Sequence, residues 1–175
     1  PRLASRVQVL RVGNFTHPKY GNFRVTPEIL KKMEQNFKSS SRRVPIDYGH
    51  GSNTEGEVAP EASRAAGWVQ SLFVEGNKLL AEVEFSPDAA RFIQNQEYRF
   101  ISPTFTFHYE SREVPKRDLG PMLMAAALTN RPFIEGMDPV SFSERLTREG
   151  GFTVDVKRVA RLLGLTEDEV KALSV

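Results

Sequence analysis

An aspartate and a histidine stand three residues apart in the stretch VPIDYGHGS, and both residue types take part in proton transfer in enzymes. Histidine has an unperturbed pKa of about 6.5, which makes His50 a natural general base near neutral pH. A carboxylate beside a histidine holds the imidazole in one tautomer, and Asp47 could supply it. The same spacing also suits a plain turn, in which Asp47 caps the loop and His50 rests on the surface. Both interpretations stay open.

A general base needs a nucleophile, and Ser102 is the serine with the most unusual setting. It lies in the aromatic stretch YRFISPTFTFHYE, between Ile101 and Pro103, where a hydroxyl gains nothing from packing. Pro103 lacks a backbone N–H, so we expect the pairing of a strand to be disturbed there. A strand bent at this point would present Ser102 in a cleft. The alternative is a serine at a bulge of an edge strand.

Other catalytic and binding chemistries find no support in the residues. The three histidines are scattered and cysteine is absent, so there is no metal-ligand spacing, disulfide framework or thiol nucleophile. The glycine-rich stretch GHGSNTEG lacks the spacing and the lysine of a phosphate-binding loop. A Gly-x-Ser-x-Gly nucleophile elbow is also missing. We therefore expect neither a metal nor a cofactor.

Composition is that of a globular chain of one domain. Hydrophobic residues make up 39% of the 175 residues and charged residues 26%. Lys and Arg number 24 against 22 Asp and Glu, which leaves a formal charge of +2 and no dense basic block. Nucleic acid is thus not favoured as a partner. The sequence shows neither a run of apolar residues that would span a membrane nor a signal peptide, so a cytoplasmic protein is expected.

Periodicity and capping residues predict the elements that must position these side chains. Helices are expected after Thr26-Pro27 and after Ser86-Pro87, each with a serine or threonine N-cap followed by proline. A hairpin is expected with its turn at residues 75–77. The apolar run MLMAAALT predicts a buried central strand. Together with strands at residues 7–13 and 98–110, this indicates an α+β domain ending near residue 140.

The remainder of the chain differs in character. Residues 141–154 are polar and interrupted by glycine, as in a linker, and residues 155–175 predict two short helices around Gly164. This pair superficially suggests a helix-turn-helix. Its second helix begins with Glu167, Asp168 and Glu169, which would be repelled by phosphates. A helical connector is therefore favoured over a DNA-binding element.

Three ordered blocks resemble the Mu-like prophage I protein family. They are VPIDYGH, then LLAEVEFSPDAARFIQNQEYRFISPTF, then AAALTNRPFIEGM, and the resemblance covers about residues 5 to 140. Members of this family are phage head maturation proteases whose C-terminal part serves as the capsid scaffold. The resemblance implies kinship with prohead proteases and herpesvirus assemblins, and hence a mainly antiparallel β-barrel flanked by helices, with a short helical C-terminal appendage. Residues 1–140 would then be the protease domain and residues 155–175 the start of the scaffold region.

The same resemblance implies roles for particular residues. His50 would be the general base and Ser102 the nucleophile. Related proteases carry an acidic residue or a histidine on the strand of the third block, where this chain has the alanines of MLMAAALT. Asp47 is the substitute we expect for this third member, with Asn130 or Thr129 as alternatives. Because Arg131 follows the strand of this third block, the resemblance implies that it would contribute to the oxyanion hole.

The function implied is that of a prohead serine protease. It would cut scaffold protein, and the major capsid protein as a further partner, inside the assembling prohead in the host bacterial cytoplasm. Self-processing is expected, and the present chain would be a truncation or a self-cleaved product. Homodimerisation is left open because assemblins act as dimers. The alternative is a non-catalytic assembly module, which predicts that Ser102 and His50 lie too far apart to share a hydrogen bond.

Overall fold

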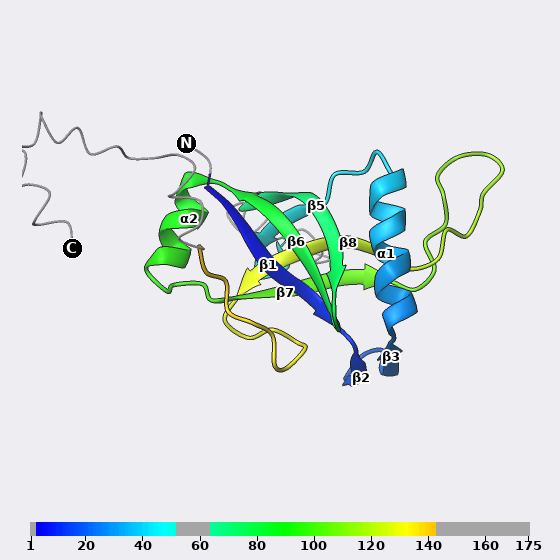
Figure 1. The fold of residues 1–175 in the computed structure, drawn as a ribbon, viewed down its shortest axis with the longest axis horizontal. Helices are drawn as coiled ribbons and strands as arrows, with labels where there is room; N and C mark the ends of the chain where they lie inside the picture. Colours follow the sequence, from blue (N-terminus) through cyan, green and yellow to red (C-terminus); the bar gives the residue numbers. More distant parts are fainter. Residues whose placement is uncertain (1–2, 52–63, 143–175) are drawn as a thin grey trace, which may run out of the picture. The chain divides into compact units, whose positions relative to one another are not determined.

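The fold is that of a computed structural model, which describes residues 3–51 and 64–142. Strands dominate, and two helices are inserted between them (Figure 1). The elements in chain order are β1 Leu3–Arg11, β2 Gly13–His17, β3 Gly21–Val25, α1 Pro27–Ser39, β4 Pro45–Tyr48, β5 Gly67–Glu75, β6 Lys78–Phe85, α2 Pro87–Gln94, β7 Phe100–Thr106 and β8 Met122–Thr129.

Six strands form one sheet in the order β1-β6-β5-β4-β8-β7, and β2 pairs with β3 in a separate two-stranded sheet. Neighbours in the large sheet are antiparallel except β4 and β8, which are parallel. The sheet curls into half a barrel, so that β1 and β7, the strands at its two ends, come near each other. The predicted α+β domain dominated by antiparallel strands is therefore confirmed.

The segment after β8 bridges the two ends of this sheet. On the β1 side, Gln8 Oε1 accepts from the Asp138 N–H at 2.7 Å, and Ser5 Oγ donates to the Ser141 carbonyl at 2.7 Å. On the β7 side, the Val140 N–H donates to the Arg99 carbonyl at 2.7 Å. These contacts include Ser141, a residue of the predicted linker, which here lies against β1 as part of the fold.

Helix α1 begins as its capping residues predict and is anchored by a buried amide. Thr26 Oγ1 accepts from the Ile29 N–H at 3.3 Å, and Pro27 occupies the first turn. Asn36 is 6% exposed, and its Nδ2 donates to the carbonyls of Leu119 and Pro121 at 2.7 and 2.8 Å. Because these carbonyls lie just before β8, the helix fixes the start of that strand.

The second predicted helix and the hairpin are also confirmed. Ser86 Oγ accepts from the Ala89 N–H at 3.2 Å and so begins α2. The β5–β6 turn has Gly76 at φ +56°, in the left-handed region that glycine adopts readily. Neither α1 nor α2, the helices of the described residues, is long and apolar enough to cross a membrane.

Other expectations are corrected in detail or lie outside the described residues. The strand expected at 7–13 starts at Leu3 and ends at Arg11, and Gly13 opens β2, which the sequence reading missed together with β3. The strand expected at 98–110 is shorter, Phe100–Thr106. The helical appendage at 155–175, and all of the linker after Phe142, lie outside the described residues.

Candidate active site

Asp47 and Ser102 occupy the same row of the sheet although they are distant in the chain. Asp47 on β4 is paired with Ala127 on β8, and Ala127 is paired in turn with Ser102 on β7. Paired residues project to the same face, so the two side chains share one face with a methyl group between them. Strands are spaced by about 4.8 Å, which puts the Asp47 and Ser102 backbones roughly 10 Å apart.

This row lies on the opposite face of the three strands from the hydrophobic core. The alternate residues Ile46, Ala126 and Ile101 belong to the core cluster, whereas Ala127 does not. All three members of the row are nevertheless buried, with exposures of 1% for Asp47, 0% for Ala127 and 2% for Ser102. A buried carboxylate and a buried hydroxyl therefore share a face built from small residues instead of core side chains.

His50 stands in a tight loop directly after β4. The Gly49 N–H donates to the Leu128 carbonyl at 3.0 Å, which extends the parallel pairing to the loop. Gly49 and His50 have φ of +59° and +64°, both in the left-handed region, where a residue with a side chain is strained. Asp47 Oδ1 accepts from the His50 backbone N–H at 3.1 Å and holds the loop in this form.

The imidazole of His50 reaches across to β7 and contacts a threonine. His50 Nδ1 lies 3.2 Å from Thr104 Oγ1, and the tautomer decides which atom donates. Residues two apart on a strand share a face, so Thr104 projects beside Ser102, with backbones roughly 7 Å apart. The structure thus brings His50, Thr104 and Ser102 to one face, with the ring bound to Thr104 in this arrangement.

Burial controls the charge state of His50. Desolvation of the half-buried ring lowers its pKa below the ordinary value, and the nearby Asp47 carboxylate opposes this by a smaller amount. The neutral imidazole, which accepts a proton, is therefore favoured at neutral pH. A ring in this state suits a general base.

This balance predicts a pH response. The pKa of His50, followed by NMR of its ring protons, should lie below about 6.5. Asp47→Asn keeps the acceptor for the His50 N–H but removes the charge that stabilises the imidazolium, so the pKa should fall further. Because the unfolded chain keeps the higher pKa, the free energy of unfolding should decrease as pH drops through 6.5 toward the folded-state pKa. An Asp138→Asn control should leave the titration unchanged, and a rise in pKa in Asp47→Asn would contradict this account.

The remaining predicted residues lie after β8. Asn130 Oδ1 accepts from the Arg99 N–H at 3.1 Å and its Nδ2 donates to the Glu97 carbonyl at 2.7 Å, so Asn130 fixes the chain before β7. Thr129 Oγ1 accepts from the Arg131 N–H at 3.0 Å. The Arg131 side chain is exposed at this end of β8. Within the described ranges, neither Asn130 nor Thr129 forms a hydrogen bond with the His50 ring.

The environment of Ser102 differs from that expected. β7 runs on through Pro103, which is paired with Ala126, and the irregularity in register falls later, between Thr104 and Phe105. Ser102 is buried in a regular stretch, neither raised into a cleft by a bend nor placed at a bulge. The proline is tolerated because β7 is an edge strand, with a ladder on one side only.

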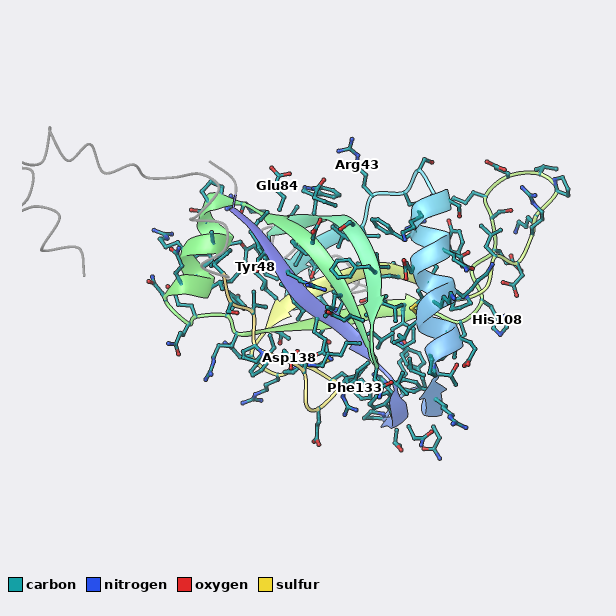
Figure 2. All side chains as sticks on the ribbon, in the orientation of Figure 1. Arg43, Tyr48, Glu84, His108, Phe133 and Asp138 are labelled. Atoms are coloured by element: carbon teal, nitrogen blue, oxygen red, sulfur yellow. The ribbon has the colours of Figure 1, made fainter. Side chains whose placement is uncertain are left out.

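The other two histidines have local partners. His108 Nδ1 lies 2.8 Å from Asp118 Oδ2 in an exposed pair, and Figure 2 places it beside α1, far from Tyr48 at the end of β4. His17 Nδ1 accepts from the Lys19 and Tyr20 N–H groups at 3.0 and 3.3 Å. Among the described residues, no group of His, Asp and Glu side chains is arranged to hold a metal ion.

Comparison with known proteins identifies the family. A family model described as the Mu-like prophage I protein, N-terminal domain, matches residues 7–141. The domain described here is thus that of a bacteriophage-related protein. The chain belongs to the Mu-like prophage I protein family, as the three motifs predicted. No curated protein and no solved structure matches the chain.

Proposed function

We propose that this domain is a serine endopeptidase of phage head maturation, with Ser102 as nucleophile and His50 as general base. The observation that carries the proposal is the convergence of His50, in the loop after β4, and Ser102, on β7, on one face of the sheet. The curled, mainly antiparallel sheet is also compatible with the barrel of prohead proteases and assemblins, to which the family resemblance points.

The chemistry would begin with a change of partner for His50. Its ring must leave Thr104 and turn toward Ser102, which lies two residues back on the same face of β7. The neutral imidazole then takes the proton from the serine hydroxyl as the oxygen attacks the peptide carbonyl. The resulting imidazolium donates that proton to the leaving amine, and water releases the acyl group by the reverse sequence.

Asp47 is the third member that this arrangement supports best. The positions on β8 that flank Ser102 and Thr104 are Ala127 and Ala125, so β8 offers no titratable group there. Asp47 lies in the row of Ala127, and its charge favours the imidazolium that forms during the reaction. Its bond to the backbone N–H of His50 also positions the loop. Arg131 follows β8 and is our candidate for stabilising the oxyanion.

The substrates in this proposal are the phage scaffold protein and the major capsid protein. Cleavage would take place inside the assembling prohead in the bacterial cytoplasm, and would include the chain that carries the protease. Confinement in the shell raises the effective concentration of enzyme and substrate, which favours encounter without a high intrinsic affinity.

A second candidate is a non-catalytic assembly module. It is favoured by one specific observation, the hydrogen bond of the His50 ring to Thr104 instead of to Ser102. In that case the buried Ser102 would be a small packing residue, and Asp47 and Thr104 would simply hold the His50 loop in place.

Reaction with a fluorophosphonate separates the two candidates, because this reagent modifies serines that a neighbouring base activates. The intact mass of the parent chain should increase by one adduct, and the mass of Ser102→Ala should not change. The assembly module predicts that neither protein is modified.

A further inference from the structure

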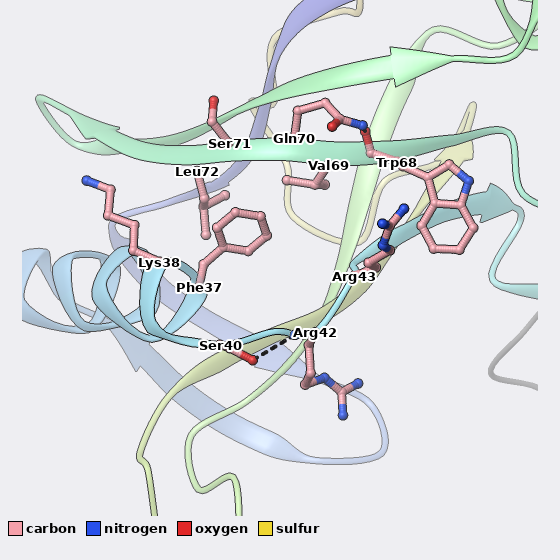
Figure 3. Close-up of a pocket in the computed structure, with 10 residues that line it drawn as sticks. All are labelled: Phe37, Lys38, Ser40, Arg42, Arg43, Trp68, Val69, Gln70, Ser71 and Leu72. Carbon is pink, nitrogen blue, oxygen red and sulfur yellow. Dashed lines mark hydrogen bonds between the residues drawn. The ribbon is translucent and has the colours of Figure 1, made fainter.

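A groove separates α1 from β5 on a part of the molecule that the candidate active site does not use. It encloses about 450 Å³, within the size range of ligand-binding clefts. Figure 3 shows β5 along one side and the end of α1 with the following loop along the other. The groove is lined by Phe37, Lys38, Ser40, Arg42, Arg43, Trp68, Val69, Gln70, Ser71 and Leu72.

One wall of this groove is an unpaired strand edge. β4 pairs with β5 only at its beginning, through Pro45 and Ile46, and the Val69 N–H donates to the Val44 carbonyl at 3.0 Å. Beyond this point β5 continues to Glu75 with β6 as its sole ladder partner. Among the described residues, none forms a backbone hydrogen bond with the edge of β5 that faces α1 between Val69 and Val74. At Val74 the backbone N–H donates to Glu34 Oε2 at 3.1 Å.

An open edge of this kind accepts an added strand. Five consecutive residues of β5, from Trp68 to Leu72, line the groove, and the last three of them, Gln70, Ser71 and Leu72, lie beyond the pairing with β4. An extended peptide laid along the edge would supply the missing backbone partners, with its alternate side chains directed into the groove.

The charges in the groove favour an acidic occupant. Its lining holds three cationic side chains and no carboxylate. Lys38 is paired with Glu34, whereas the exposed Arg43 has no ion-pair partner among the described residues. Arg42 Nη1 donates to the Tyr109 hydroxyl at 2.9 Å, and its Nε is buried without a hydrogen-bond partner. Within the part of the chain that the structure describes, the charge of Arg43 is thus uncompensated, and a carboxylate on an incoming strand would pair with it.

We propose that this groove binds an extended, acidic segment of a partner polypeptide by addition of a strand to the open edge of β5. The site goes beyond the proposed protease activity, since it involves neither Ser102 nor His50. Single-stranded nucleic acid would also be drawn to cationic side chains beside a tryptophan. An unpaired strand edge, however, recognises a peptide backbone. Single-stranded nucleic acid is bound by several aromatic side chains on which successive bases stack, and this groove has one exposed tryptophan.

The fluorescence of Trp68 can report peptide binding in this groove. Trp68 is the single tryptophan of the chain, it is 39% exposed, and it lies at the end of the groove beside Arg43 (Figure 3). The probe is a capped octapeptide of alternating glutamate and valine, titrated while tryptophan fluorescence is recorded. Saturable binding is expected, and Arg43→Glu should weaken it by about tenfold or more. Arg112→Glu makes the same charge change at a residue of the β7–β8 connection that does not line the groove, and it should bind as the parent does. Circular dichroism verifies that both variants are folded.

A second peptide tests the strand addition itself. N-methylation of alternate residues keeps the side chains but removes the donors along one edge, so it should abolish most of the binding. Equal binding of the methylated peptide would overturn the proposal, as would equal binding of a lysine–valine octapeptide. Binding of a short oligothymidylate in place of the acidic peptide would also overturn it. Fluorescence detects binding whether or not peptide is cut, so the result is separate from that for the protease.

Discussion

Ser102→Ala is expected to slow proteolysis by about 10⁴- to 10⁶-fold, and His50→Ala should have an effect of similar size. In the proposed mechanism the serine oxygen would form the acyl bond and the imidazole would carry its proton, so neither group would have a function without the other. The double variant should therefore be no slower than either single variant. The measurement is the initial rate at which a phage scaffold protein is cut, followed by gel densitometry.

His108→Ala is the matched control for this comparison. His108 is exposed and paired with Asp118, so its loss should leave the rate at the parental value. If the effects of Ser102→Ala and His50→Ala multiply in the double variant, the two residues act independently, and the proposed pair is wrong. A parental rate in Ser102→Ala would show that the nucleophile is another residue.

Phe85→Ala is expected to destabilise the fold by about 3–5 kcal/mol. Phe85 is 0% exposed at the end of β6, and its ring contacts that of Phe142 edge-on, with centroids 6.1 Å apart. It is paired with Gly67, where an added Cβ would lie 3.1 Å from the Phe85 ring. Loss of the ring would leave a cavity where β5, β6 and the segment after β8 meet.

Urea unfolding followed by circular dichroism measures this effect against Phe133→Ala. Phe133 is 37% exposed, so its removal creates no closed cavity and should cost clearly less. Domains are stable by only about 5–15 kcal/mol, and the Phe85 variant should therefore lose a large part of its stability. Equal shifts of the midpoint in the two variants would contradict the assignment of Phe85 to the core.

Local signals in the sequence predicted the elements whose ends are determined by neighbouring residues. The Thr26-Pro27 and Ser86-Pro87 pairs marked the starts of α1 and α2, and Gly76 marked the turn between β5 and β6. The β2–β3 hairpin was missed, because the strand predicted at residues 7–13 included Gly13, which in fact begins the next strand.

The arrangement of the site depends on pairing between distant parts of the chain. Asp47 and Ser102 share a row only because β8 lies between β4 and β7 and pairs with β4 in parallel, and sequence spacing does not contain this information. Thr104 was not singled out, although its position two residues after Ser102 on a strand was a usable signal. The expected disturbance at Pro103 did not arise because β7 is an edge strand.

The most direct test of the central claim, that His50 activates Ser102, is to map the fluorophosphonate adduct by mass spectrometry of the digested chain. The account predicts the adduct on Ser102 in the parent and its loss in His50→Ala. An adduct on Thr104, an adduct on Ser102 that persists without His50, or no adduct in the parent would each contradict it.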